Sequence, residues 1–271
     1  MPEPVISSLQ NPRIKNAIKL RDRRRRSQQK RILIDGAREL SRAIASGIQV
    51  VEAFVCPTLC QSTEAQQVLE ALVRCRAIIL EVTPAVFEKL AFGERAEGVL
   101  GIAETPEARL EQLDLPERPL LAVLEGIEKP GNVGAVLRSA DAAGLAAVIV
   151  ANGRTDLYNP NAIRASLGTI FTQRVLEATS SQASQWLTER RIQIVAARVD
   201  GQRSYTDIDY RLPTAIVLGS EANGLSAAWS GPAVTAVKLP MLGAADSLNV
   251  SATAAVMFYE ALRQRQSSVR S

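Results

Sequence analysis

The spacing of hydrophobic residues over the first 104 positions predicts strands that alternate with helices. Short apolar runs rich in β-branched residues, typical of buried strands, occupy residues 32–34, 50–56, 78–82 and 98–103. Apolar side chains three or four positions apart predict helices over residues 11–26, 36–45, 64–75 and 84–90. This order of elements is typical of an α/β unit of about 100 residues.

The same alternation continues more strongly from residue 118 onward. Strands are expected over 120–124, 146–151, 192–199, 214–218 and 234–239, and helices over 132–143, 160–167, 183–190 and 249–265. Several of these strands are continuous apolar runs, which is typical of a parallel sheet covered on both faces. Residues 105–117 are polar and contain prolines, so we expect a linker there, between a domain over 1–104 and a second α/β domain over 118–271.

The composition narrows the chemistry that this chain can perform. Hydrophobic residues make up 46% and charged residues 22% of the 271 positions, as in globular proteins. No apolar run approaches the ~20 residues that span a bilayer, and the chain does not begin with a secretory pattern, so we expect a soluble, cytoplasmic protein. Histidine is absent, which excludes histidine-dependent hydrolases and the common zinc sites. Of the three cysteines, we expect Cys56 and Cys60 to be small buried side chains, and we expect no metal site.

Positive charge is concentrated in residues 11–31. Ten basic residues and one acidic residue lie there, so this segment carries +9 in a chain whose net charge is +4. Such a segment suits a polyanion, with a solvated helix face and an anionic membrane as alternatives. We favour nucleic acid contacted through its backbone, because the segment's apolar face is weak and aromatic residues make up only 4% of the chain. The residues expected to bind RNA are Arg21, Arg23, Arg24, Arg25, Arg26, Lys30 and Arg31, with Arg164 from the second half.

Three loops follow apolar strands at the edge where open α/β sheets bind ligands. In the first, residues 121–144, neither a phosphate loop nor a dinucleotide fingerprint is present, which disfavours a nucleotide-dependent enzyme. Asn132 is expected to cap the following helix. Because helical side chains lean towards the N-terminus, Arg138 can bring its guanidinium near Asn132. The alternative is a surface arginine beside a capping asparagine.

The other two loops carry further polar side chains. In residues 215–226, Glu221 places a carboxylate at a strand end between two glycines, which also fits an ordinary turn. In residues 238–251, Ser247, Asn249 and Ser251 are all good helix caps. Three candidates exceed what one helix needs, so free N–H groups at this helix start could meet a ligand.

Taken together, these segments resemble the TrmH/SpoU-type ribose 2′-O-methyltransferases of the SPOUT superfamily. The resemblance lies in Pro130-Gly-Asn-Val-Gly-Ala-Val-Leu-Arg138, Leu218-Gly-Ser-Glu-Ala-Asn-Gly-Leu225 and Leu239-Pro-Met with Ser247-Leu-Asn-Val-Ser251, in the family's order and spacing. The stretch from Tyr158 to Gly168 is also similar. The N-terminal half resembles a ribosomal-protein-like substrate-binding domain found in many members. Two departures are Ala222, where a glycine is common, and Lys129, where an acid is common.

The resemblance implies a deep trefoil knot in the second domain, a homodimer, and S-adenosylmethionine as the cofactor. The implied reaction is methyl transfer to a ribose 2′-hydroxyl, most readily of ribosomal RNA, with transfer RNA or a non-catalytic ribosome-assembly role as alternatives. The implied cofactor-binding residues are Leu218, Gly219, Leu239, Met241, Ser247 and Leu248. The implied catalytic residues are Asn132, Arg138, Glu221, Ser247 and Asn249, with Asn132 holding Arg138 in place.

Overall fold

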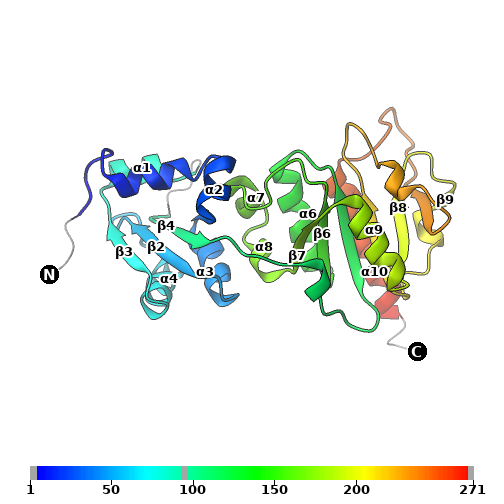
Figure 1. The fold of residues 1–271 in the computed structure, drawn as a ribbon, viewed down its shortest axis with the longest axis horizontal. Helices are drawn as coiled ribbons and strands as arrows, with labels where there is room; N and C mark the ends of the chain where they lie inside the picture. Colours follow the sequence, from blue (N-terminus) through cyan, green and yellow to red (C-terminus); the bar gives the residue numbers. More distant parts are fainter. Residues whose placement is uncertain (1–4, 93–96, 268–271) are drawn as a thin grey trace. The chain divides into compact units, whose positions relative to one another are not determined.

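The computed structural model describes residues 5–92 and 97–267, and the chain divides into two compact units (Figure 1). Unit 1 comprises Met1–Glu107 together with Tyr158–Thr172, and unit 2 comprises Ala108–Leu157 and Gln173–Ser271. The expected domain limits at residues 104 and 118 stay predictions. The structure adds that the segment Tyr158–Thr172, which lies in the second half of the sequence, packs with unit 1.

Unit 1 is built on a four-stranded mixed sheet in the order β1-β4-β2-β3. Its strands are β1 (Arg31–Asp35), β2 (Val50–Val55), β3 (Ile78–Glu81) and β4 (Val99–Glu104), and β4 runs antiparallel to both of its neighbours. Its helices are α1 (Pro12–Lys19), α2 (Arg23–Gln29), α3 (Ala37–Ala45), α4 (Thr63–Arg74), α5 (Pro84–Leu90), α7 (Pro160–Ala165) and α8 (Thr169–Thr172). The four strands expected in this half are confirmed. Cys56 and Cys60 are buried, as expected.

The basic segment is not the single helix that the sequence predicted over residues 11–26. The chain leaves the helix after α1, and Asp22 caps α2 by accepting a hydrogen bond from the backbone N–H of Arg25. The guanidinium of Arg26 donates to the backbone oxygens of Leu20 and Arg21 at 2.6 and 2.7 Å. Leu20 is the C-cap of α1 and Arg21 follows it, and carbonyls at a helix end have no partner within the helix. Arg26 therefore stabilises the break between the two helices.

Unit 2 is built on a seven-stranded sheet in the order β7-β6-β5-β10-β8-β11-β9, in which every pair of neighbours is parallel. Its strands are β5 (Leu120–Glu125), β6 (Ala147–Ala151), β7 (Val175–Ala178), β8 (Gln193–Ala197), β9 (Arg203–Ser204), β10 (Thr214–Leu218) and β11 (Val234–Lys238). Its helices are η1 (Leu110–Gln112), α6 (Pro130–Ala142), α9 (Ser180–Glu189), η2 (Tyr205–Asp207), η3 (Ala227–Trp229) and α10 (Val250–Ser267). Helix α9 covers one face of the sheet, and α6 and α10 pack together on the other (Figure 1).

The predicted fold class, an α/β protein with two α/β parts, is confirmed, and the trefoil knot stays a prediction. The sequence missed the short elements α8, β7 and β9, whose apolar runs are too brief to show a period. The segment predicted as a linker contributes Leu110, from η1, to the core of unit 2. Among the described residues, no helix is long and apolar enough to cross a membrane, and no group of side chains could hold a metal ion.

Candidate functional site

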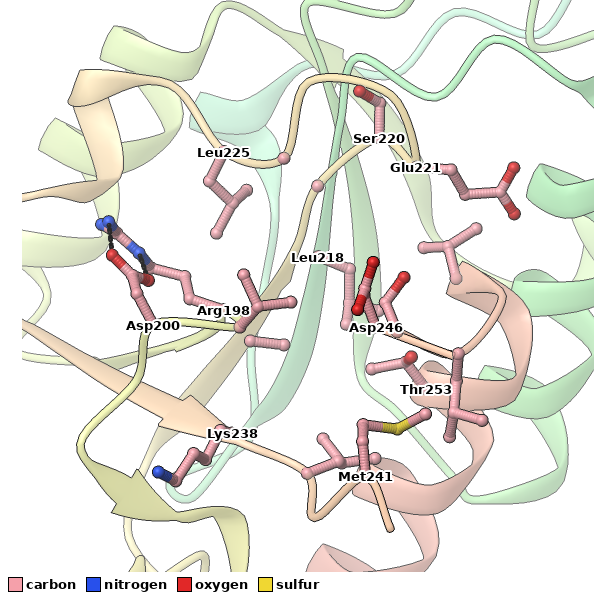
Figure 2. Close-up of a pocket in the computed structure, with 18 of the residues that line it drawn as sticks. Arg198, Asp200, Leu218, Ser220, Glu221, Leu225, Lys238, Met241, Asp246 and Thr253 are labelled. Carbon is pink, nitrogen blue, oxygen red and sulfur yellow. Dashed lines mark hydrogen bonds and ion pairs between the residues drawn. The ribbon is translucent and has the colours of Figure 1, made fainter. Parts of the chain in front are cut away.

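A pocket of about 730 Å³ opens at the carboxyl ends of β8, β10 and β11 (Figure 2). Its walls are the ends of these strands, the loops that follow them and the first turn of α10. Such loops lie together at the carboxyl edge of a parallel sheet, because the chain leaves every strand at that edge before it returns to the other edge for the next strand. A volume of this size is typical of a small-molecule site.

The structure places all six residues predicted to bind the cofactor on the wall of this pocket. Leu218 ends β10 and Gly219 follows it. Leu239 and Met241 follow β11. Ser247 and Leu248 precede α10. The residues come from three segments and line a cavity whose wall is both apolar and polar.

Position 219 requires a glycine because of the close approach of the backbone there. A Cβ atom at this position would lie 2.4 Å from the carbonyl of Gly224, so no other residue fits the turn as it stands. The N–H of Gly224 donates to the backbone oxygen of Ser220 at 2.9 Å and closes the same turn. The missing side chain thus lets the loop after β10 fold tightly onto itself beside the pocket.

A polar cluster joins the three loops that the sequence singled out. The Glu221 Oε1 atom accepts hydrogen bonds from the side-chain amides of Asn132, at 3.1 Å, and Asn249, at 2.5 Å. Its other oxygen lies 3.4 Å from the ammonium of Lys129. Asn249 also caps α10, because its side-chain oxygen accepts from the N–H of Ser251. One carboxylate therefore holds the starts of α6 and α10 together at the rim of the pocket.

Two details of the first loop differ from expectation. Asn132 does not cap α6: the helix begins at Pro130 after Lys129, and the Asn132 amide is directed to Glu221 instead. Arg138 lies two turns into α6 and is exposed. It makes no hydrogen bond or ion pair with any residue that the structure describes, so its predicted contact with Asn132 is not formed. The guanidinium is left available to a partner outside the described chain.

Glu125, at the end of β5, is a buried polar residue that the sequence reasoning missed. Its carboxylate is 5% exposed and accepts from the hydroxyl of Ser180, and from both the N–H and the hydroxyl of Ser226 at 2.7 Å. Burial alone would raise its pKa, but the hydrogen bonds from these two serines hold the pKa below the usual value. Ser226 lies two residues after Gly224, so Glu125 anchors the loop that carries Glu221. The sequence signal that could have identified Glu125 is an acidic residue placed directly at the end of an apolar strand.

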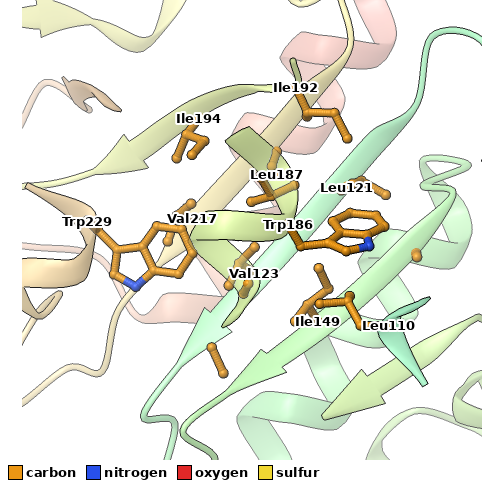
Figure 3. Packing of buried hydrophobic residues seen from close by; sticks show 14 of the residues in the cluster. Leu110, Leu121, Val123, Ile149, Trp186, Leu187, Ile192, Ile194, Val217 and Trp229 are labelled. Atoms are coloured by element: carbon orange, nitrogen blue, oxygen red, sulfur yellow. The ribbon is translucent and has the colours of Figure 1, made fainter. Parts of the chain in front are cut away.

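The strands that carry these groups are fixed by close packing behind the pocket. Val123 of β5 and Val217 of β10 lie in one hydrophobic cluster with Trp186 and Trp229 (Figure 3). Both valines are fully buried. Because tightly packed interiors deform little, the ends of β5 and β10 are rigid supports for Glu125 and Leu218.

The residues predicted to bind RNA fall into two groups. Arg26 is 3% exposed and is bonded to the end of α1, so it is not available to RNA, which corrects the prediction for this residue. Among the others, Arg21 is bonded to the carbonyls of Lys89, Leu90 and Ala91, and Arg25 donates to the side-chain oxygen of Gln28. Lys30 and Arg31 are paired with Glu107 and Glu104, and Arg164 lies 3.7 Å from Asp35. Arg23, Arg24 and Arg25 are exposed along α2. The exposed positive charge of this segment therefore lies on α2 and, through Lys15 and Lys19, on α1.

Comparison with known proteins gives the family. The model of the SpoU rRNA methylase family matches residues 119–259, and the model of the MRM3-like substrate-binding domain matches residues 11–101. The chain belongs to the SpoU rRNA methylase family. A 23S rRNA (uridine(2479)-2′-O)-methyltransferase of Streptomyces viridochromogenes is 31% identical over 255 residues, which are 91% of this chain and 87% of that protein.

Solved structures of the family agree over almost the whole chain. The crystal structure of an RNA 2′-O ribose methyltransferase is 44% identical, covers 97% of this chain and 100% of its own, and has a TM-score of 0.86. The SpoU methyltransferase AviRb from Streptomyces viridochromogenes, solved with the cofactor AdoMet, is 30% identical, with coverage of 95% and 99% and a TM-score of 0.86. The similarity thus extends over both units.

Proposed function

We propose that this protein is an S-adenosylmethionine-dependent methyltransferase that modifies a ribose 2′-hydroxyl in 23S ribosomal RNA. The observation that carries the proposal is the polar cluster of Asn132, Glu221 and Asn249 at the rim of a pocket lined by all six expected cofactor residues. Family membership and relatives named for this reaction support it.

The residues of the pocket fit the cofactor. Leu218, Leu239 and Met241 supply apolar contacts, and the backbone of the loops after β10 and β11 supplies donors and acceptors for an adenine and a ribose. Bound there, S-adenosylmethionine supplies an electrophilic methyl group on a positively charged sulfur. Ser247 and Leu248 would close the side of the pocket next to α10. Relatives solved with AdoMet bound support the choice of cofactor.

At the rim, the chain's own groups would position the attacking hydroxyl. Glu221 fixes the amides of Asn132 and Asn249, so that little reorganisation is needed when RNA arrives. Arg138 would bind the ribose oxygen and a neighbouring phosphate, and would stabilise negative charge that develops on the oxygen. An arginine side chain is a poor general base, so the role of Arg138 is that of a cation, and the hydroxyl proton passes to phosphate or water.

The exposed arginines of α2 would bind the RNA backbone. Arg23, Arg24 and Arg25 lie in the part of the chain matched by a substrate-binding domain model. Lys30, Arg31, Arg21 and Arg164 would add positive potential while keeping their contacts within unit 1. Contacts to phosphates carry no sequence information, so the choice of nucleotide would come from RNA shape around the pocket.

We further propose a homodimer, a knotted chain in unit 2 and a cytoplasmic site of action. The dimer is supported by exposed apolar side chains on α10, of which Val256 is 38% and Tyr259 52% exposed, beside α6 with its unbonded Arg138. Light scattering on purified protein would measure the mass: twice the chain mass is expected, and a monomer would contradict the dimer.

The decisive test is methyl transfer from labelled S-adenosylmethionine to unmodified ribosomal RNA and, in a separate reaction, to transfer RNA. Nucleoside mass spectrometry then identifies the product. We expect label in one 2′-O-methyl nucleoside of 23S RNA. Label found only in transfer RNA would show that transfer RNA, and not ribosomal RNA, is the substrate. Cofactor binding without transfer to naked RNA or to ribosome-assembly particles would favour the non-catalytic role.

A further inference from the structure

The charged side chains on the wall of the pocket differ in their partners. The Arg198 guanidinium binds the Asp200 carboxylate through two hydrogen bonds of 2.8 and 2.7 Å, and Glu221 is held by the amides of Asn132 and Asn249. The carboxylate of Asp246 makes no hydrogen bond and no ion pair with any residue in the described part of the chain. It is therefore a negative charge on the pocket wall without a bonded partner among the described residues; Lys238, a second cation on the same wall, is not paired with it.

Asp246 faces the cavity. It lines the same pocket as Leu218, Glu221 and Thr253 (Figure 2). A carboxylate without an ion-pair partner attracts a cation that binds in the pocket, because opposite charges a few ångströms apart lower each other's energy.

The position of Asp246 along the chain indicates which cation this would be. Ser247 follows it directly, and Asn249, three residues on, is bonded to Glu221 in the polar cluster. Asp246 thus lies on the short segment that leads from the cofactor pocket to the transfer site. Resting on the proposed function, we propose that the Asp246 carboxylate contacts the sulfonium end of S-adenosylmethionine and makes the pocket select the methyl donor over its demethylated product.

The selection follows from charge. S-adenosylmethionine carries a positive sulfur, whereas S-adenosylhomocysteine carries a neutral one and keeps the same adenosine and amino-acid groups. A carboxylate near the sulfur therefore attracts only the donor. After transfer the attraction disappears, so the spent cofactor is held less tightly and exchanges for a new donor. Because Asp246 is exposed in the free protein, salt should reduce the preference.

The test is calorimetric titration of the full-length protein with S-adenosylmethionine and, separately, with S-adenosylhomocysteine, before and after Asp246→Asn. We expect the variant to bind the donor about tenfold more weakly, as for loss of one partly exposed charge contact, and to bind the product within about twofold of the parent. Glu111→Gln is the matched control, because it removes an exposed carboxylate of unit 2 that does not line the pocket. This control should leave both affinities unchanged.

Three outcomes would overturn the inference. Equal weakening of donor and product would assign Asp246 to a group that both share, such as the amino-acid ammonium, or to the shape of the loop. Unchanged binding of both would remove Asp246 from the site. A stronger loss for the product would reverse the sign of the effect. Failure of the parent protein to bind either compound would instead contradict the proposed function, and is separable from all three.

Discussion

The basic segment of unit 1 and the pocket of unit 2 are both rich in charged side chains, and the two regions use them differently. In unit 1, Arg21 and Arg26 bind backbone carbonyls at helix ends, and Arg31 is paired with Glu104. In unit 2, Arg198 and Asp200 on the pocket wall are bonded to each other, whereas Asp246 in the pocket and Arg138 on α6 have no partner in the described part of the chain. A charged residue with its hydrogen bonds satisfied inside the fold contributes to stability, whereas one left without partners at a cavity or helix surface is available for a ligand.

The largest effect expected from this contrast is at Arg138. Arg138→Ala should lower the rate of methyl transfer by about 10²–10³-fold, as for loss of a group that stabilises charge in the transition state. Because Arg138 has no bonded neighbour in the described chain, the folded state should be undisturbed and cofactor affinity nearly intact. Single-turnover transfer assays, with calorimetric cofactor titration alongside, measure both quantities. A parallel loss of cofactor binding would show that Arg138 is structural.

Glu125 provides the opposite case within unit 2, a carboxylate whose partners all lie inside the protein. Glu125→Ala should lower the free energy of unfolding by about 3 kcal/mol, because it leaves the N–H of Ser226 and the hydroxyl of Ser180 without their acceptor. Both tryptophans lie in the core of unit 2, so denaturant unfolding followed by their fluorescence reports the change.

Glu125→Gln is the matched control for that measurement. A glutamine keeps one oxygen as acceptor for the Ser226 N–H, while its amide can donate to a serine hydroxyl, so the loss should be smaller than with alanine. Since the folded pKa of Glu125 is lowered, its contribution is present at neutral pH and is lost as the pH falls through that pKa. Equal losses for Gln and Ala would show that the carboxylate charge is required.

Much of this contrast was predictable from the sequence. The rest depends on contacts between residues that are far apart along the chain. The three loops and their polar residues follow from apolar strands and cap chemistry, which are local. The role of Glu125 is not a local feature of the sequence, because its partners Ser180 and Ser226 lie 55 and 101 residues away along the chain. Likewise nothing in the run Arg23–Arg26 marks its last member, because burial of Arg26 depends on where α1 ends.

Substitutions within the arginine run would test whether its exposed members bind RNA while the buried Arg26 stabilises the fold. Replacing Arg23, Arg24 and Arg25 together by Ala should weaken RNA binding and reduce the slope of log affinity against log salt by about 2–3, as for three lost phosphate contacts. Folding should be almost unaffected. Filter binding at salt concentrations from about 50 to about 200 mM gives the slope, because the affinity contributed by phosphate contacts falls steeply over this range. An unchanged slope would remove α2 from the RNA interface.

Arg26→Ala is expected to behave in the reverse way. It removes the guanidinium that satisfies the carbonyls of Leu20 and Arg21, so unit 1 should lose about 2 kcal/mol of stability. Circular dichroism is the suitable probe, since unit 1 contains neither of the two tryptophans. The salt slope of RNA binding should stay as in the parent. A reduced slope at unchanged stability would return Arg26 to the RNA-binding group.

The smallest effect is expected at Asp35, at the end of β1 in unit 1, where a buried charge is only partly compensated. The pKa of Asp35 is raised to about 6, mainly by burial and in smaller part by Glu97 and Glu39, while a hydrogen bond from the Phe92 N–H and the nearby Arg164 act to lower it. The folded protein therefore holds a proton that the unfolded chain releases at lower pH, and stability falls as the pH rises from about 4 to about 6. Asp35→Asn keeps an acceptor for Phe92 without the charge, so above pH 6 it should stabilise unit 1 by about 1 kcal/mol and flatten this dependence. Thermal unfolding by circular dichroism from pH 4.5 to 8 measures the difference, and a gain that is equal at every pH would show that the carboxyl does not titrate in this range.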